Sequence, residues 1–434
     1  MSGTLIKSIR ARQVYTNRGK PGVEAIVTTE NGVEERAVCT SGISIGTHEV
    51  NFTFDGGKMF GGKGVQNAVD NVNKIIGPAL IGLDAADQKT VDSAMLSIMP
   101  NAKAKLGGNA TAAVSAAVLK AGAKALGIPL YKHIGGADAT HLPVPGVGLV
   151  AGDSRYGGGM TTPGGKPTMS VMCYGFDKFS EASYAAWDIQ YLWTKKMEQK
   201  FGGVQSKRDF FSIPKGVYKC DREIWDDMMD TVIKAGYENK VGFQMDVATD
   251  TYHNKQDDKY YGLFDDKPKT KEELYKFYMQ IINDYPFLII EDPFNEDDYE
   301  TTARLTAESG IQIVGDDLFT TNIERVKYGI ERNAANAVLL KVNQIGTLSE
   351  AFEMIRYAYK YNYAVMPSDS RGEGAAIADY SVGINAGSVR ESAVGERGNR
   401  FLEIEEELGD NAKFIGAKGL KGFRNQKRAE NIGK

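Results

Sequence analysis

The sequence predicts an α/β protein in which a barrel of repeated strand–helix units follows a smaller N-terminal α+β domain. Between residues 240 and 371, five short apolar runs each end in an ionisable residue, and these ends lie 25 to 45 residues apart. A strand, its following helix and two turns occupy about that much chain. The runs are continuously apolar, as expected of parallel strands that are covered on both faces. The first 40 residues, by contrast, are typical of an antiparallel sheet.

The N-terminal domain is predicted to comprise residues 1–140. Three β-rich stretches within residues 6–39 predict an antiparallel meander, with a tight turn at residues 30–32. Residues 65–76 carry apolar side chains at helical spacing, and the alanine-rich residues 107–125 predict a buried helix. Strands followed by helices indicate an α+β arrangement.

The second predicted domain comprises residues 141–434. It opens with LPVP at residues 142–145, where prolines beside a valine run indicate a boundary and an entering strand. An irregular glycine-rich stretch follows at residues 152–168, and a loop of this length is either a disordered linker or a lid over a site. Its central part, residues 157–167, leads from one apparent strand into another, which favours a lid.

Composition limits the class of protein. The chain has 434 residues, a formal net charge of −4 and 42% hydrophobic residues, which is enough for two domains with separate cores. No arginine-rich run or basic face stands out, which argues against a nucleic-acid partner. Three cysteines without metal-type spacing indicate reduced thiols. No stretch has the length of a membrane span, and no signal peptide is apparent, so we expect a cytoplasmic enzyme without a membrane partner.

Three successive strand–helix units end in a carboxylate, at Asp246, Glu291 and Asp316. In barrel enzymes, residues at the C-terminal ends of the strands line the active site. Carboxylate oxygens suit Mg²⁺, which commonly binds a few carboxylates together with water and substrate. An acid at a strand end can also simply cap the next helix, but three in successive units favour a Mg²⁺ site.

Lys341 ends the fourth apolar run. A lysine at the end of an apolar strand near a divalent ion has its ammonium form disfavoured, so it can act as a base. The alternative is a salt bridge between Lys341 and one of the acids. Together, the carboxylates and the lysine predict a divalent-metal site beside a base.

Six motifs along the chain resemble those of enolases. They are SGISIGTHE (41–49), LPVP (142–145), IEDPFNEDD (290–298), IQIVGDDL (311–318), LLKVNQIGTLSE (339–350) and RFLEIEEELGDNA (400–412). The resemblance covers essentially the whole chain. It implies an enolase-type modified eight-fold α/β TIM barrel after an α+β capping domain. It also implies Mg²⁺ dependence, a homodimer and dehydration of 2-phosphoglycerate to phosphoenolpyruvate.

The same motifs imply roles for individual residues. Asp246, Glu291 and Asp316 match the metal-binding carboxylates of the family. Lys341 matches the lysine that removes the proton next to the substrate carboxylate. Ser44 matches the loop serine that is associated with a second magnesium ion.

The resemblance weakens in the loops that supply acid groups in enolases. Arg155 stands where the loop histidine belongs, and Thr168 stands where the glutamate of QEFM belongs. Pro214 lies nearest the position of the glutamate in the GDEGG loop. Since general acid catalysis contributes roughly 10²–10⁴-fold, loss of these glutamates predicts slow dehydration.

The predicted substrate-binding positions differ as well. SDSRGE replaces SHRSGE, so that Asp369, Ser370 and Arg371 replace histidine, arginine and serine. Arg390 replaces the lysine that binds the substrate carboxylate. Asp369 is either an acid or a partner of Arg371. Together with Arg155, Arg371 and Arg390 make the predicted pocket more cationic than that of enolases. Arginine favours carboxylates and anions such as phosphate or phosphonate.

We therefore predict a Mg²⁺-dependent lyase of the enolase superfamily that removes a proton α to a carboxylate. The predicted substrate is small, highly anionic and different from 2-phosphoglycerate, as in phosphonate chemistry of the carboxyphosphonoenolpyruvate synthase kind. The first alternative is ordinary enolase activity, with Glu373 or Asp369 supplying the acid. The second is a non-catalytic enolase-like binding protein, which the retained carboxylates and Lys341 disfavour.

Overall fold

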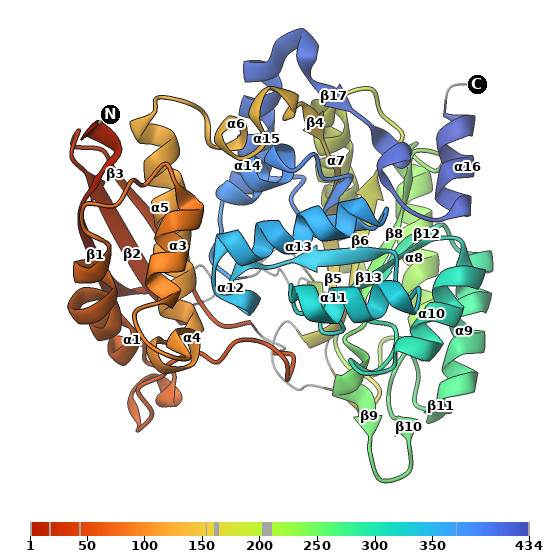
Figure 1. Cartoon of the computed structure of the whole chain (residues 1–434). Coiled ribbons are helices and arrows are strands. Elements are labelled where there is room, and N and C mark those ends of the chain that lie inside the picture. Colours follow the sequence, from red (N-terminus) through yellow and green to blue (C-terminus); the bar gives the residue numbers. More distant parts are fainter. Residues whose placement is uncertain are drawn as a thin grey trace.

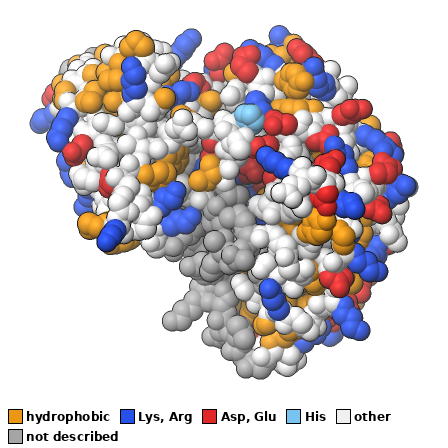
Figure 2. All heavy atoms as spheres, turned by 90° about the horizontal axis from the view of Figure 1, so that it is seen from below, with side chains coloured by type: hydrophobic (Ala, Val, Ile, Leu, Met, Phe, Trp, Pro, Cys, Tyr) orange, Lys and Arg blue, Asp and Glu red, His pale blue; other side chains and the backbone are white. Residues whose placement is uncertain are grey.

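The protein is described by a computed structural model that covers residues 2–16, 19–42, 45–152, 154–159, 165–201, 211–369 and 371–432. Figure 1 shows an N-terminal lobe, coloured red to orange, beside a larger lobe that contains the barrel. On the face seen in Figure 2, acidic and basic side chains are interspersed with small hydrophobic groups.

The N-terminal lobe begins with an antiparallel meander. Its strands pair in the order β1-β2-β3, with bounds β1 Ile6–Tyr15, β2 Pro21–Thr29 and β3 Glu34–Cys39. The helices that follow are α1 (Gln66–Asn71), α2 (Gly77–Leu80), α3 (Gln88–Leu96), α4 (Ala102–Leu106), α5 (Gly108–Ala125) and α6 (Leu130–Gly135). Small side chains let α5 pack closely on β2 and β3, and the lobe has its own hydrophobic core.

The barrel is built from a second sheet with the strand order β15-β14-β13-β12-β8-β6-β5-β16. A parallel bridge between Ser368 and Arg390 joins its two edges. The bounds are β5 Val144–Gly152, β6 Gly165–Cys173, β8 Val241–Asp246, β12 Phe287–Glu291, β13 Gln312–Gly315, β14 Ala337–Leu340, β15 Ala364–Pro367 and β16 Ser388–Val389. The short β7 (Phe211–Ser212) pairs with β5. Nearly every residue of the barrel strands is buried, which explains their continuously apolar sequence.

The direction of one strand decides which residues reach the barrel rim. Strands β8, β12, β13, β14 and β15 run parallel, whereas β6 runs antiparallel to both β5 and β8. Thr168 of β6 pairs with Asp246, the last residue of β8. The start of β6 therefore lies at the rim where β8 and the strands parallel to it end. Because side chains alternate along a strand, Lys166 and Thr168 share one face.

Helices surround the barrel (Figure 1), and several of them are amphipathic. In α13, for example, the buried residues Leu348, Ala351, Met354, Ile355 and Ala358 form one stripe. The helices are α7 (Phe179–Phe201), α8 (Asp221–Lys234), α9 (Lys271–Asp284), α10 (Tyr299–Ser309), α11 (Ile323–Glu331), α12 (Val342–Ile345), α13 (Leu348–Lys360), α14 (Ala376–Gly383), α15 (Gly395–Leu408) and α16 (Phe423–Asn431). The remaining short strands are β4 (His141–Leu142), β9 (His253–Asn254), β10 (Lys259–Tyr260), β11 (Lys269–Thr270) and β17 (Lys413–Phe414).

The predicted lid at residues 157–167 is described only in part. Residues 160–164 lie outside the described residues, and β6 already begins at Gly165. The last three residues of the predicted lid are therefore strand rather than loop. The function of the remainder as a lid stays a prediction.

Among the described helices, none is by itself long and apolar enough to cross a membrane. Helix α5 and the helical segment Leu130–Asp138 pass a test of length and composition only as a pair, with a 98° bend between them. Most of α5 is buried in the core of the N-terminal lobe.

Candidate active site at the barrel rim

The structure brings the three strand-end carboxylates together. Asp246 and Glu291 end the neighbouring strands β8 and β12 and are paired in register, and Asp316 directly follows β13. All three are at most 4% exposed. Oxygens of Glu291, Asp292 and Asp316 lie within 4.8 Å of one another. Such a group of buried carboxylates costs free energy unless cations offset its charge.

Asp292 accepts hydrogen bonds from the backbone at this rim. Its two oxygens accept hydrogen bonds from the N–H groups of Asp316 and Asp317, each at 2.9 Å. Burial, with the nearby charges of Asp317 and Asp316, raises the pKa of Asp292 well above its usual range. Burial and the charge of Asp316 likewise raise the pKa of Asp317 to about 8. Asp292 thus holds the segment after β13 and so fixes the position of Asp316.

Lys341 lies beside Asp316, between β14 and α12. Its ammonium forms an ion pair with Asp316, whose other oxygen accepts a hydrogen bond from Gln344 Nε2 at 2.7 Å. Burial alone would raise the pKa of Asp316, but the charges of Lys341 and Arg371 outweigh it and lower this pKa to about 2. Lys341 is 4% exposed. The salt bridge weighed for this lysine is therefore present, and it places the amine at the edge of the carboxylate cluster.

Arg390, directly after β16, crosses the barrel mouth. Its guanidinium donates to Glu291 at 2.9 Å, to Thr168 Oγ1 at 3.2 Å and to Glu391 at 3.3 Å, and it also contacts Asp246. Burial still raises the pKa of Glu291, although the charge of Arg390 opposes this shift. Arg390 thus ties four barrel strands together at the site.

Lys166 is a charged residue that sequence reasoning missed. Its ammonium forms a second ion pair with Asp246, and its side chain is 9% exposed. Burial and the charge of Arg390 lower the pKa of Lys166 to about 7. Lys166 lies near the start of an antiparallel strand, whereas the predicted carboxylates lie at the ends of parallel ones. A lysine within the apolar run KPTMSVMC was the available signal.

The cluster fits a divalent cation. Glu291 Oε2 is buried and has no hydrogen-bond partner among the described residues. Five carboxyl groups lie in this cluster, with Lys166, Lys341 and Arg390 as ion-pair partners of three of them; the five are those of Asp246, Glu291, Asp292, Asp316 and Asp317. A divalent cation would supply a partner for the free oxygen of Glu291.

Arg371 binds a carboxylate of the N-terminal lobe. Its guanidinium forms a bidentate ion pair with Glu49, and both side chains are at most 3% exposed. Glu49 also accepts hydrogen bonds from Gln344 Nε2 at 3.3 Å and from the N–H of Gly46 at 3.1 Å. The pair joins the two lobes next to Asp316 and Lys341. Sequence reasoning did not connect Glu49 with this site, because the two partners are 322 residues apart.

Asp369 has other partners than the predicted Arg371. Its carboxylate accepts a hydrogen bond from the N–H of Gly374 at 3.2 Å and lies 3.5 Å from Arg397. Of the two roles left open for Asp369, pairing with Arg371 is not seen among the described residues, where Glu49 is the bidentate partner of Arg371. Nearby, burial and the charge of Asp369 raise the pKa of Glu373 to about 7.

Arg155 is directed away from the strand-end carboxylates. Its guanidinium lies 3.5 Å from Asp221, at the start of α8, and donates to the carbonyl oxygen of Ala151 at 3.2 Å. The residue is 7% exposed. The two predicted serines, Ser44 and Ser370, lie outside the described residues.

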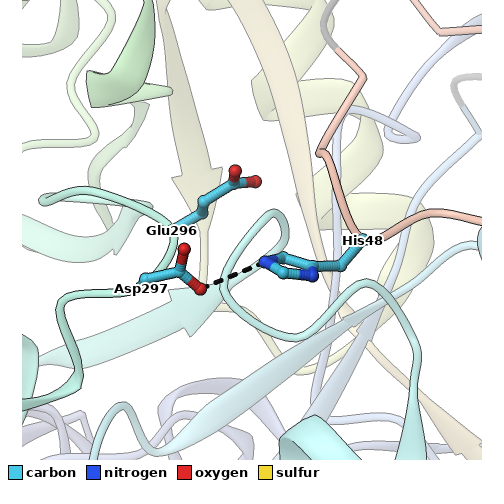
Figure 3. A group of neighbouring side chains, drawn as sticks. All are labelled: His48, Glu296 and Asp297. Atoms are coloured by element: carbon cyan, nitrogen blue, oxygen red, sulfur yellow. Dashed lines mark hydrogen bonds and ion pairs between the residues drawn. The ribbon is translucent and has the colours of Figure 1, made fainter.

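A second, exposed contact joins the loop after Ser44 to the barrel. His48 Nε2 lies 3.1 Å from Asp297, and Thr47 donates to Glu296 from both its N–H and its hydroxyl. Figure 3 shows His48 directed toward Asp297, with Glu296 beside it. Arg325 also donates to Asp297, at 3.1 Å. These contacts and the Glu49 pair attach residues 45–49 to the barrel rim.

Comparison with known proteins identifies the family. The family model for the enolase N-terminal domain matches residues 6–134, and that for the enolase C-terminal TIM barrel domain matches residues 139–423. The chain belongs to the enolase family. A protein named enolase from Methanococcus aeolicus is 42% identical over 416 residues, which cover 93% of this chain and 96% of that protein. The enolase of Methanocaldococcus jannaschii is 41% identical with the same coverage. The enolase of Thermococcus kodakarensis is 38% identical over 436 residues, covering 97% and 98% of the two chains.

These comparisons confirm several predictions. The chain resembles enolases over its whole length, its fold is an α+β domain followed by a TIM barrel, and it is a lyase of the enolase superfamily. Members of this family depend on Mg²⁺, with which the carboxylate cluster is compatible.

The predicted shift of substrate away from 2-phosphoglycerate is wrong. Proteins named enolase are 38–42% identical to this chain over nearly its full length, which favours ordinary enolase activity over phosphonate chemistry. The prediction treated each replaced side chain as a lost function. The structure instead provides other charged groups near the site, namely Lys166, Glu373 and Glu391.

Proposed function

We propose that this protein dehydrates 2-phosphoglycerate to phosphoenolpyruvate with Mg²⁺ as its cofactor. The observation that carries the proposal is the contact between Lys341 and Asp316, beside the unpartnered oxygen of Glu291. A candidate base and a candidate cation site thus lie in one buried cluster. The similarity to proteins named enolase over nearly the whole chain supports the same reaction.

Asp246, Glu291 and Asp316 are the proposed Mg²⁺ ligands, because they are oxygen donors on one barrel rim. Ser44, from the N-terminal loop, is the proposed ligand of a second ion. Bound Mg²⁺ would supply Lewis-acid stabilisation of the negative charge that develops on the substrate carboxylate.

Lys341 is the proposed base. Its neutral amine takes the proton from the carbon next to the substrate carboxylate, and the C–H electron pair remains as the intermediate's charge. Lys341 is buried and lies against Asp316, so its amine is held at the rim where the proposed Mg²⁺ ligands lie. The intermediate's electron pair then forms the carbon–carbon double bond, while the C–O bond breaks and the hydroxyl leaves.

The leaving hydroxyl needs a proton to depart as water. Asp369 is the proposed acid. Glu373 is the alternative, since desolvation and the charge of Asp369 raise the pKa of its carboxyl group to about 7. Arg390 is the proposed partner of a substrate anion, because its guanidinium lies at the barrel rim among the proposed Mg²⁺ ligands. Substrate binding by Arg155, Ser370 and Arg371 stays a prediction. Like Arg390, Arg155 and Arg371 are each paired with a carboxylate that they would have to leave to reach an anion.

The proposal is tested by NMR of 2-phosphoglycerate with the full chain and Mg²⁺ in D₂O. Deuterium entry at the carbon next to the carboxylate and formation of phosphoenolpyruvate are followed together, with an EDTA-treated sample as control. We expect both to proceed and both to stop with EDTA. Exchange without product would contradict the acid assignment, and the absence of both would overturn the proposed function.

Two further features accompany the proposal. We propose a homodimer or a higher homo-oligomer, and light scattering coupled to gel filtration tests this. A mass near the 47.3 kDa of one chain would contradict it. A domain division at residue 140 and a cytoplasmic location stay predictions.

A further inference from the structure

Two cations share one carboxylate at the barrel rim. Lys166 and Arg390 both contact Asp246 Oδ2. Their side chains are 9% and 6% exposed, and that of Asp246 is 1% exposed. Two like charges at a single buried oxygen repel each other, and little water is present to screen them. Asp246 thus holds two cations that repel each other, one of which it shares with Glu291.

The two cations are held unequally. Arg390 also donates to Glu291, Thr168 and Glu391, so its guanidinium stays fixed without Asp246. For the ammonium of Lys166, Asp246 is the single ion-pair partner that the described residues provide. An ammonium on a flexible four-carbon chain also gives up fewer directed hydrogen bonds than a planar guanidinium when it turns away from a carboxylate. Lys166 is therefore the cation that can leave.

The backbone of Lys166 is anchored while its side chain lies at the rim. Its carbonyl oxygen accepts a hydrogen bond from the Tyr252 hydroxyl, and the preceding Gly165 pairs with Gly152 of β5. Since β6 begins at Gly165, Lys166 is only the second residue of the strand. Its ammonium can therefore move toward the rim without a change in the barrel backbone.

We propose that Lys166 is a tethered cation that neutralises Asp246 in the metal-free protein and must leave this carboxylate before a divalent cation binds there. This inference rests on the proposed function, because it takes Asp246 as a ligand of that cation. Lys166 is a positioning residue in this scheme. It keeps the carboxylate cluster folded when no metal is bound, and it weakens metal binding by competition.

The test is titration calorimetry of the full chain with Mn²⁺, a spectroscopically useful substitute for Mg²⁺, in the absence of substrate. We expect Lys166→Met to bind Mn²⁺ about tenfold or more tightly than the wild type, because one competing charge is gone. Lys166→Arg, which keeps the charge, should stay within about threefold of the wild type. Lys269→Met is the matched control: Lys269 is also a buried lysine paired with an aspartate, Asp265, but lies in the separate sheet of β9, β10 and β11.

Thermal melting gives a second readout that does not depend on turnover. Without metal, Lys166→Met should melt below the wild type, because Asp246 loses a partner, and Mn²⁺ should raise its Tm by more than it raises that of the wild type. Lys166→Gln keeps a donor for Asp246 without the charge and provides the same comparison if the methionine variant does not fold.

The outcomes separate the two proposals. Equal or weaker Mn²⁺ binding by the uncharged variants would overturn the role of Lys166 and leave the proposed function intact. Absence of Mn²⁺ binding in the wild type and the variants alike would overturn both the tethered cation and the proposed metal site.

Discussion

The two halves of the candidate site differ in how their charged residues are placed. In the strand-end half, Arg390 contacts both Asp246 and Glu291, an oxygen of Glu291 lies within 4.8 Å of one of Asp316, and Lys341 lies against Asp316. In the loop half, the charged side chains turn to separate partners. Those contacts join Arg155 to Asp221, Arg371 to Glu49 and Asp369 to Arg397.

This difference shows that, for a charged residue, a position at a strand end predicts the location of its side chain better than a position in a loop. The register of neighbouring parallel strands fixes both the place and the direction of a strand-end side chain. A long charged side chain on a loop can reach several partners, and the nearest opposite charge decides among them. Replacements in the loops therefore gave a misleading indication of substrate.

The largest effect is expected from the strand-end half. Lys341→Met should lower the rate of phosphoenolpyruvate formation by about 10²–10⁴-fold, because the proposed base is removed. The measurement is the steady-state rate with 2-phosphoglycerate and Mg²⁺. Lys196→Met, which breaks the ion pairs with Asp227 and Asp230 on α8, is the control and should keep near wild-type activity. Nearly full activity in Lys341→Met would contradict the assignment of Lys341 as the base. The strand-end half would then not be the more important half for the reaction.

The next effect concerns stability in the loop half. Arg371→Met leaves Glu49 buried and unpaired and should cost about 3–5 kcal/mol in the free energy of unfolding, measured with urea. Glu49→Gln should cost a similar amount. The double variant should lose less than the sum of the two single variants, because no unpaired charge remains. Strictly additive losses would contradict the coupling of the two residues.

A smaller effect separates two arginines. Arg390→Gln should raise the KM for 2-phosphoglycerate by about 10- to 150-fold, since the proposed charged hydrogen bonds to the substrate anion are lost. Arg155→Gln should change KM by less than about tenfold and instead lower the melting temperature, because Asp221 loses its ion-pair partner. If Arg155→Gln had the larger effect on KM, the loop half would contain the substrate-binding arginine.

The smallest effect belongs to the exposed contact of Figure 3. The side chains of His48 and Asp297 are 38% and 61% exposed, so solvent screens their attraction. His48→Ala should change the free energy of unfolding by less than about 1 kcal/mol. A loss as large as that of Arg371→Met would mean that the exposed contact, rather than the buried pair, joins the two lobes.

Much of the site could be predicted because it lies at strand ends. Continuous apolar runs located β8, β12, β13 and β14, and the residues that end or follow them were the candidate ligands and base. The same rule did not predict Lys166, because β6 runs in the opposite direction and an apolar run does not show the direction of its strand. The rule did not predict Glu49 either, because a bidentate ion pair between residues 322 positions apart leaves no local sequence pattern.

The sequence alone determined the family, the barrel and the carboxylates with their lysine, because hydrophobic periodicity and long motifs are local properties of the chain. Tertiary structure alone decided which cation each carboxylate meets: Lys166 and Arg390 at Asp246, Lys341 at Asp316, and Arg371 at Glu49. The physical reason is that buried charges must be paired, and the nearest partner depends on how distant strands and lobes pack rather than on their order in the chain.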